Sequence, residues 1–324
     1  MPHQSLCVII PVLNEERMIG PLAEALFPVL EETGLDWSVL FVDDGSTDGT
    51  MAGIRALAAG NPRVKALSFS RNFGKEQAMA AGLRAADADA VILMDADLQH
   101  PPAAIPAFIA QWKAGAQIVY GQRGNREADS FMRRATSDAF HAVYGAMAGG
   151  RLPRGIVDFV LLDRAAVAAM NRLDERARFT KGMFAWIGFR AAVVPFDSPD
   201  RLIGETRFNY LKLLRFALDG IASFSTLPLR MWTYIGGTIS LLALLYAAYF
   251  LIKTLLFHTD VPGFPSIIVS IMFFSGVQLL SLGIIGEYVG RIFEEVKRRP
   301  LYIVAETVGM EAPAETAPAK APDA

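Results

Sequence analysis

Two long stretches without charge, near the end of the chain, constrain its fold most. Residues 231–252 run between Arg230 and Lys253, and residues 267–286 end before Glu287. Crossing a bilayer takes about 20 predominantly apolar residues, so each stretch is long enough to span a membrane. A pair of buried core helices is the alternative. Charged residues still make up 20% of the 324 residues, so a globular domain must accompany the two spans.

The distribution of basic residues predicts the orientation of these spans. The connector between them, residues 254–266, carries only His258 and Asp260 as polar titratable groups. Basic residues lie instead on the other side of each span, at Lys212, Arg215, Arg230, Arg291, Lys297, Arg298 and Arg299. Because positive loops stay in the cytoplasm, we expect the N-terminal domain and the C-terminal tail to be cytoplasmic.

Four regions follow from these patterns. We expect a catalytic domain at 1–208, a juxtamembrane amphipathic helix at 209–229, two transmembrane helices within 230–290, and a basic segment with a disordered tail at 291–324. A helix facing the core of the soluble domain is the alternative for 209–229.

The N-terminal part alternates between short β-branched runs and stretches that favour helices. The runs lie at 6–12, 38–42, 64–69, 90–94 and 117–120, and the helical stretches at 15–32, 48–59, 75–86 and 102–113. This alternation predicts βαβ units in an α/β fold with a mostly parallel sheet and helices on both faces. Such sheets bind ligands at the carboxyl ends of their strands.

Acidic residues follow one of these strands in the segment MDADLQHPP, residues 94–102. Alternate residues of an extended segment project the same way, so Asp95, Asp97 and Gln99 could present three oxygen ligands. Oxygen ligands suit a hard divalent cation such as Mg²⁺ or Mn²⁺. A strand-end turn that caps the next helix is the alternative.

A second acidic strand end occurs in VDDGSTDGT, residues 42–50. A turn and a helix cap account for Gly45, Ser46 and Asp48. They do not account for Asp43 beside Asp44, because adjacent carboxylates repel each other unless hydrogen-bond donors or positive charges face them. The hydroxyls of a ribose and the edge of a base are suitable donors.

Basic residues near the later strands could complete a phosphate site. Each of them alone would be a solvated surface charge, but a diphosphate beside a cation needs further positive charge. The candidates are Arg71, Lys75, Arg123, Arg133 and Arg134, with Arg201 and Arg207 close to the proposed membrane junction.

Together these segments resemble the family-2, GT-A-type glycosyltransferases, in particular the branch that acts on polyprenyl phosphates and includes dolichyl-phosphate mannose synthase and bactoprenol glucosyltransferase. The matching segments are VIIPVLNEE, VDDGSTDGT, SRNFGKEQAMAAG, MDADLQHPP, RFTKG, GETRFNY and IGEYVGRIFEEVKRRPLYIV. The resemblance covers about residues 7–304.

The resemblance implies roles for individual residues. It places the cation at Asp95, Asp97 and Gln99, and gives catalytic roles to Asp97 and to Asp158, for which a buried or capping aspartate is the alternative. It places the acceptor phosphate at Arg201 and Arg207, the latter being lysine in many relatives. The implied contacts to the nucleotide-sugar are Pro11, Leu13, Glu15, Asp43, Asp44, Asp95, Arg123 and Arg134.

The implied activity is inverting transfer of one sugar, UDP-glucose being the first expectation for the donor, to undecaprenyl phosphate in the inner membrane of a bacterium. We expect no nucleic-acid partner, and the family's tendency towards tetramers suggests a homo-oligomer. N-acetylglucosamine, galactose, mannose and aminoarabinose stay open as the sugar. A processive polysaccharide synthase is the main rival, although we find neither its QxxRW-like motif nor further spans. A nucleotidyltransferase would carry a Gly-rich phosphate loop, and a membrane scaffold would not need two acidic strand ends.

Overall fold

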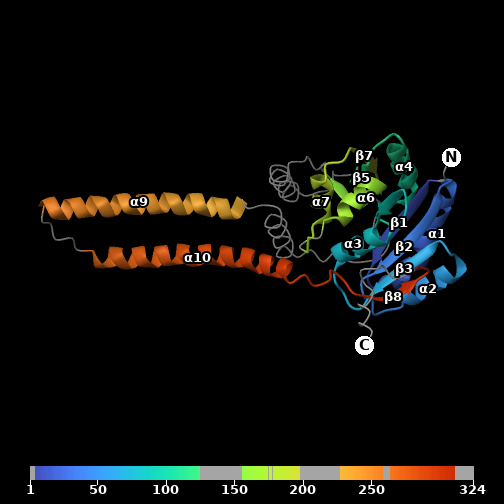
Figure 1. The fold of residues 1–324 in the computed structure, drawn as a ribbon, viewed down its shortest axis with the longest axis horizontal. Helices are drawn as coiled ribbons and strands as arrows, with labels where there is room; N and C mark the ends of the chain where they lie inside the picture. Colours follow the sequence, from blue (N-terminus) through green and yellow to red (C-terminus); the bar gives the residue numbers. More distant parts are fainter. Residues whose placement is uncertain are drawn as a thin grey trace, which may run out of the picture. The chain divides into compact units, whose positions relative to one another are not determined.

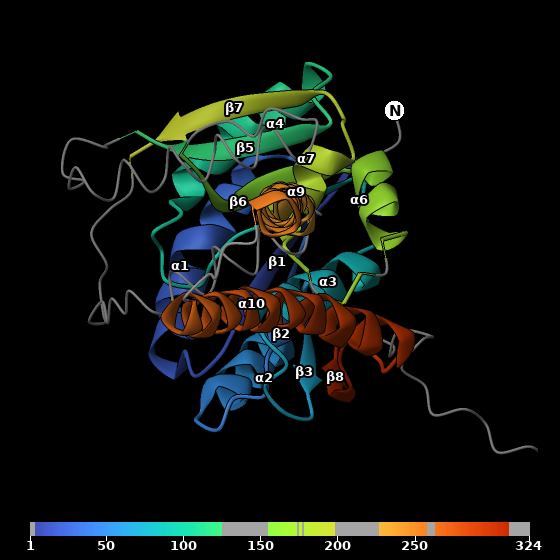
Figure 2. The ribbon, with the colours of Figure 1, turned by 90° about the vertical axis from the view of Figure 1, so that its left-hand side faces the viewer.

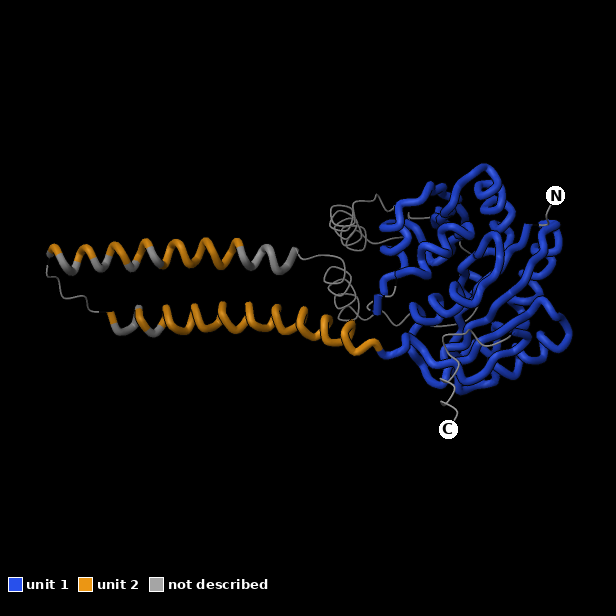
Figure 3. The backbone as a smooth tube through the Cα atoms, viewed as in Figure 1, with its two compact units in different colours: residues 1–210, 299–324 blue, residues 211–298 orange. Residues whose placement is uncertain are grey.

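The computed structural model describes residues 4–124, 155–197 except 174 and 177, 227–257 and 263–310. The chain divides into two compact units (Figure 3). Residues 1–210 and 299–324 make up the first, and residues 211–298 make up the second. Both ends of the chain therefore belong to the first unit.

The first unit begins with the predicted alternation of strands and helices (Figure 1). In chain order the elements are β1 Ser5–Val12, α1 Glu16–Glu32, β2 Asp36–Asp43, α2 Thr50–Gly60, β3 Val64–Phe69, α3 Lys75–Ala85, β4 Ala90–Leu93, the 3₁₀ turn η1 Pro102–Ala104, α4 Ile105–Lys113 and β5 Ile118–Arg123. After residue 154 come β6 Ile156–Asp163, α6 Arg164–Asn171, α7 Thr180–Trp186 and β7 Ala191–Phe196.

The described strands form one sheet in the order β7-β5-β6-β4-β1-β2-β3-β8, the last strand being Val304–Val308. In Figure 2 this order runs from β7 at the top to β8 at the bottom. β1 pairs in parallel with β2 and β4, and β2 pairs in parallel with β3. β6 is antiparallel to both β4 and β5. The start of β6 therefore lies at the same edge of the sheet as the carboxyl ends of β1, β2 and β4.

Helices cover both faces of the central strands, which is why these strands are apolar throughout. On one face, Leu6, Val8 and Ile10 of β1 belong to the same buried cluster as Leu22 and Leu26 of α1. On the other face α3 approaches β1 so closely that a Cβ at Gly82 would lie 2.3 Å from Cγ2 of Ile9. The predicted α/β fold with a mostly parallel sheet is confirmed.

The last strand, β8 Val304–Val308, was not predicted. It pairs antiparallel with β3, and the guanidinium of Arg55 donates to both carboxylate oxygens of Glu306 at 2.7 and 2.6 Å. The ring of Tyr302 stacks on Phe69 with centroids 5.0 Å apart. Part of the segment 291–324, expected to be basic and then disordered, thus completes the sheet, while residues 311–324 lie outside the described part.

The second unit contains two long helices, α9 Leu227–Phe257 and α10 Phe264–Val296, which run in opposite directions (Figure 1). Among the described residues, the stretch Val269–Val296 is long and apolar enough to cross a membrane, and none of its apolar window is buried. In α9, the apolar stretch that is described without interruption is Tyr234–Ala243. The predicted surface helix at 209–229 lies outside the described residues as far as 226. The hairpin expected after the sheet domain is therefore present as a pair of helices.

Candidate active site

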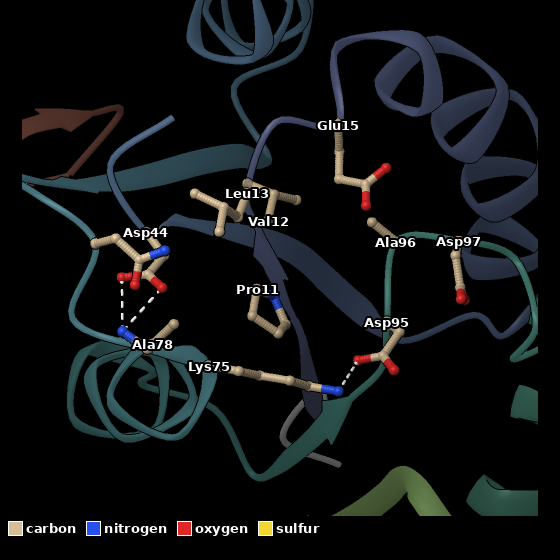
Figure 4. Close-up of a pocket in the computed structure, with 12 residues that line it drawn as sticks. Pro11, Val12, Leu13, Glu15, Asp44, Lys75, Ala78, Asp95, Ala96 and Asp97 are labelled. Carbon is tan, nitrogen blue, oxygen red and sulfur yellow. Dashed lines mark hydrogen bonds and ion pairs between the residues drawn. The ribbon is translucent and has the colours of Figure 1, made fainter. Parts of the chain in front are cut away.

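A pocket of about 300 Å³ opens at the carboxyl ends of β1, β2 and β4 (Figure 4). Strand pairing explains the assembly, because β1 is in register with β2 up to the pair Val12 and Asp43 and with β4 up to the pair Ile9 and Leu93. The loops that follow these strands therefore meet. The pocket is lined by Pro11, Val12, Leu13, Glu15, Asp44, Asn72, Gly74, Lys75, Ala78, Asp95, Ala96 and Asp97.

The loop after β1 is held against the loop after β2 by hydrogen bonds. Asn14 has a positive φ of 56°, which asparagine tolerates better than most residues. Its backbone N–H donates to Oγ of Ser46 at 2.8 Å, and its Oδ1 accepts from the N–H of Thr47 at 2.8 Å. The N–H of Glu15 donates to Oγ1 of Thr50 at 2.9 Å. These bonds fix the backbone from which Leu13 and Glu15 line the pocket.

The acidic pair at the end of β2 finds its hydrogen-bond donors within the chain. Asp43 is buried and accepts from the N–H of Ser46 at 3.0 Å and from Oγ of Ser68 at 2.7 Å. Asp44 accepts from the N–H groups of Phe73 and Gly74 at 2.6 and 2.9 Å. The chain therefore supplies the hydrogen-bond donors that Asp43 and Asp44 need, and the pair requires none from a nucleotide. Asp44 still lines the pocket, whereas Asp43 is not among its described lining residues.

On the other side of the pocket, ion pairs connect two acidic residues from different strands. Nζ of Lys75, the first residue of α3, lies 2.6 Å from Oδ1 of Asp95 and 3.0 Å from Oδ2 of Asp158. Nζ of Lys181 lies 3.1 Å from Oδ1 of Asp158. Figure 4 shows the Lys75 side chain reaching past Pro11 to Asp95. Asp95 and Asp158, 63 positions apart in the sequence, are thus joined through one ammonium group.

These contacts change the proton affinity of Asp158. Burial raises the pKa of Asp158, but the charges of Lys181 and Lys75 outweigh burial and lower that pKa to about 2. Burial lowers the pKa of Lys75, but the charges of Asp95 and Asp158 raise it by more, so the pKa of Lys75 lies above its ordinary value. At neutral pH Asp158 is therefore an anion held between two ammonium groups.

The loop after β4 contains a residue whose role the sequence did not reveal. Nδ1 of His100, which is buried, accepts from the N–H of Asp95 at 3.0 Å, and its ring stacks on Phe159 with centroids 5.2 Å apart. Burial lowers the pKa of His100, which keeps the ring neutral and able to accept this bond. His100 therefore fixes the backbone of the acidic segment, and its place in DADLQHPP is the only signal in the sequence.

The same loop presents Asp97 to the pocket through an uncommon backbone conformation. Leu98 has a positive φ of 57°, and the N–H of Gln99 donates to Oδ1 of Asp97 at 3.1 Å. A non-glycine residue with positive φ stores strain that surrounding contacts must hold, as is frequent at functional sites. Gln99 itself is not among the described lining residues.

The donor atoms at this loop fit a hard divalent cation. No group of three or more His, Cys, Asp or Glu side chains suited to a metal ion occurs among the described residues. Asp95 and Asp97 nevertheless line one pocket, and two carboxylates are a common protein contribution when phosphate oxygens or waters supply the other ligands. The predicted roles of Asp95, Asp97 and Gln99 as cation ligands remain predictions.

Not every predicted site residue lies at this pocket. Arg123 is exposed at the end of β5 and is not among the described lining residues. Arg134, Arg201 and Arg207 lie outside the described residues. Lys181 was not predicted, although it stands in the segment RFTKG that contributed to the family resemblance.

Comparison with known proteins gives matches over most of the chain. The sequence pattern of glycosyl transferase family 2 matches residues 7–174, and that of the GtrB C-terminal hairpin matches residues 227–292. An uncharacterized glycosyltransferase of Synechocystis is 45% identical over 94% of this chain and 96% of its own length. A prophage-derived bactoprenol glucosyl transferase of Shigella flexneri is 42% identical over 93% of this chain and 98% of its own length.

Among solved structures, a glucosyl-3-phosphoglycerate synthase from Mycobacterium tuberculosis is 20% identical, with a TM-score of 0.48, over 68% of this chain and 78% of that chain. The match to the family pattern covers the strands from β1 to β6 and the acidic pocket, and the two relatives, matched over nearly their whole length, confirm the resemblance drawn from the sequence motifs. The chain is a glycosyltransferase and belongs to glycosyl transferase family 2.

Proposed function

We propose that this enzyme transfers a single glucose from UDP-glucose to undecaprenyl phosphate, with inversion at the anomeric carbon. The observation that carries the proposal is the pocket in which Asp95 and Asp97 face Asp44 and Glu15, in a chain whose C-terminal part matches the GtrB hairpin. Relatives that are 41–42% identical over more than nine-tenths of this chain are named bactoprenol glucosyl transferases.

The two sides of the pocket suit the two parts of a nucleotide-sugar. The side formed by Pro11, Leu13 and Asp44 offers apolar surface and one carboxylate, which suits a base and its ribose. The side formed by Asp95, Asp97 and Lys75 suits a diphosphate that reaches the protein through a divalent cation. When bound, such a cation supplies positive charge that offsets the charge developing on the leaving diphosphate.

The reaction needs little help from a base. An oxygen of the lipid phosphate forms the new bond to the anomeric carbon, and the bond from that carbon to the diphosphate oxygen breaks as the nucleoside diphosphate leaves. A phosphate monoester has a second pKa of about 6, so the nucleophile is already largely an anion at neutral pH. Asp158, with its pKa of about 2, would then serve to hold Lys75 and Lys181 rather than to accept a proton.

The position of the enzyme follows from its acceptor. A polyprenyl chain does not leave the bilayer readily, because each exposed CH₂ costs about 0.8 kcal/mol. We propose that α9 and α10 both cross the inner membrane and that the catalytic domain is cytoplasmic, which agrees with the basic residues that flank the two spans. Arg201 and Arg207 are our candidates for the acceptor phosphate.

The test uses the full-length enzyme in detergent with a short polyprenyl phosphate and a panel of labelled nucleotide-sugars, with and without EDTA. We expect a lipid-linked monosaccharide from UDP-glucose and none in the presence of EDTA. Transfer from another nucleotide-sugar alone would refute glucose as the substrate. A product with many sugars would refute single transfer, and full activity with EDTA would refute the cation.

A further inference from the structure

Lys75 is the one basic residue among the described residues that line the pocket. Its ammonium lies 2.6 Å from Oδ1 of Asp95 and 3.0 Å from Oδ2 of Asp158, and its side chain is 42% exposed. Lys75 begins α3 directly after Gly74, whose φ of 112° suits glycine and sets the direction in which the helix starts. The Lys75 ammonium is therefore paired with Asp95, a carboxylate to which the proposed function assigns a divalent cation.

We propose that Lys75 is a positioning residue that holds Asp95 as an internal cation while no metal is bound, and that a divalent cation must displace it from Asp95. This inference rests on the proposed cation site. Two cations drawn to the same carboxylate repel each other, and this repulsion is strong where water is partly excluded. Binding of the metal thus competes with the ion pair between Lys75 and Asp95.

The chain provides a second partner for the displaced ammonium. Asp158 already accepts a hydrogen bond from Lys75 at 3.0 Å, and Nζ of Lys181 lies 3.1 Å from the other oxygen of Asp158. Lys75 can therefore lose Asp95 without becoming a charge with no counter-ion. Because Lys75 contacts both carboxylates, binding of a cation at Asp95 can change the ion pair at Asp158, which lies on β6.

A further contact keeps the two lysines in place. Glu76, next to Lys75, accepts hydrogen bonds from the backbone N–H of Thr180 at 2.9 Å and from the hydroxyl of Thr180. Thr180 precedes Lys181 at the start of α7. The first turns of α3 and α7 are thus fixed to each other, so that a displaced Lys75 ammonium stays close to Asp158.

The test measures the binding of Mn²⁺ to the full-length enzyme in detergent, without nucleotide or lipid, by electron paramagnetic resonance of the free ion. Lys75→Met removes the charge and keeps most of the side-chain length. We expect this variant to bind Mn²⁺ roughly tenfold more tightly than the wild type, because the competing ammonium is gone. Lys75→Arg, which keeps the charge, should bind as weakly as the wild type.

Lys113→Met, at the exposed end of α4, is the matched control and should leave the affinity unchanged. In EDTA, Lys75→Met should melt at a lower temperature than the wild type. Saturating Mn²⁺ should raise the melting temperature of Lys75→Met by more than it raises that of the wild type. A second variant, Lys75→Gln, should behave in the same way, which separates loss of charge from a packing defect of methionine.

Equal or weaker binding of Mn²⁺ by both Lys75→Met and Lys75→Gln would overturn the inference, as would absence of binding by every form. The outcome is separable from that of the proposed function. If the wild type transfers glucose while the affinities of the variants do not change, the role of Lys75 fails and the proposed reaction stands. If the variants bind Mn²⁺ more tightly but no nucleotide-sugar is used, the proposed reaction fails and the role of Lys75 stands.

Discussion

Replacing Asp158 with asparagine tests whether this residue holds charges or accepts a proton. The pKa of Asp158 is lowered from 3.8 to about 2 by Lys181 and Lys75, against the effect of burial. At about 1.4 kcal/mol per pH unit, this difference is worth about 2 kcal/mol. Because the side chain is only 28% exposed, solvent screens this contribution little.

The sign of the effect on stability follows from the direction of the shift. A carboxyl group whose pKa is lower in the folded state contributes its full stabilisation above the unfolded pKa of about 4 and loses it as the pH falls towards 2. At neutral pH, Asp158→Asn should therefore remove about 2 kcal/mol, which corresponds to a fall of roughly 4–8 °C in Tm for a domain of this size. If the same energy positions the two ammonium groups in the transition state, the rate should fall roughly 30-fold.

As a proton acceptor, Asp158 would be poor. A carboxyl group with a pKa of about 2 is protonated in roughly one molecule in 10⁵ at pH 7. The acid limb of the rate profile should therefore come from the acceptor phosphate, near its second pKa of about 6, and should be the same in the wild type and in Asp158→Asn.

Asp97→Ala, which removes a proposed ligand of the cation, should reduce transfer by roughly 10³-fold or more.

The assay is the initial rate of lipid glycosylation over a range of pH, with thermal melting of each variant as the control for folding. Equal loss of activity in Asp158→Asn and Asp97→Ala would refute the division of roles between them. An acid limb that is present in the wild type and absent from Asp158→Asn would identify Asp158 as a base and would refute the reasoning from its pKa.

Three further predictions concern the metal and the fold. EDTA should stop transfer and Mn²⁺ or Mg²⁺ should restore it; an unchanged rate would contradict the cation site. Gly45→Ala should destabilise the domain by about 2 kcal/mol or more in thermal unfolding, because Gly45 has a φ of 75° and an added Cβ would lie 2.5 Å from the carbonyl carbon of Arg71. The control Gly20→Ala, with nothing within 4 Å in the interior of α1, should be neutral or stabilising. Glu306→Gln should speed proteolysis of the C-terminal strand β8. Hydrogen bonds from Arg55 lower the pKa of Glu306, so acidification of the wild type, which protonates Glu306, should speed this cleavage too. Unchanged cleavage would show that the pair of Arg55 and Glu306 does not hold β8.

The strands at the centre of the sheet could be predicted because their sequences carry the signal locally. The runs predicted at 6–12 and 64–69 lie within a residue of β1 and β3 as observed. β8 could not be predicted, since Val304–Val308 is short, partly exposed and a strand only because β3 offers an unpaired edge. A pairing between segments more than 200 positions apart leaves no trace in local periodicity.

The candidate site, like the sheet, could be predicted only in part. Asp95, Asp97 and Asp44 were found because each follows an apolar strand, and parallel strands bring such ends together. Lys75 stood among several basic residues that could each be a solvated charge, and Lys181 was not considered. Only the antiparallel pairing of β6 with β4, which brings Asp158 to the same edge as Asp95, gives these lysines a shared partner in Asp158.

The two acidic strand ends, similar as sequences, therefore have different physical roles. The carboxylates at the end of β2 accept hydrogen bonds from backbone N–H groups and a serine hydroxyl, all fixed by the fold, so Asp43 and Asp44 organise the loops at this edge of the sheet. Asp95 instead pairs with the ammonium of a long side chain that has Asp158 as a second partner. A flexible lysine side chain can move away from a carboxylate oxygen and make room for a metal ion, whereas backbone N–H groups that are fixed by the fold cannot. This difference in the mobility of the partners is why we place the chemistry at the end of β4.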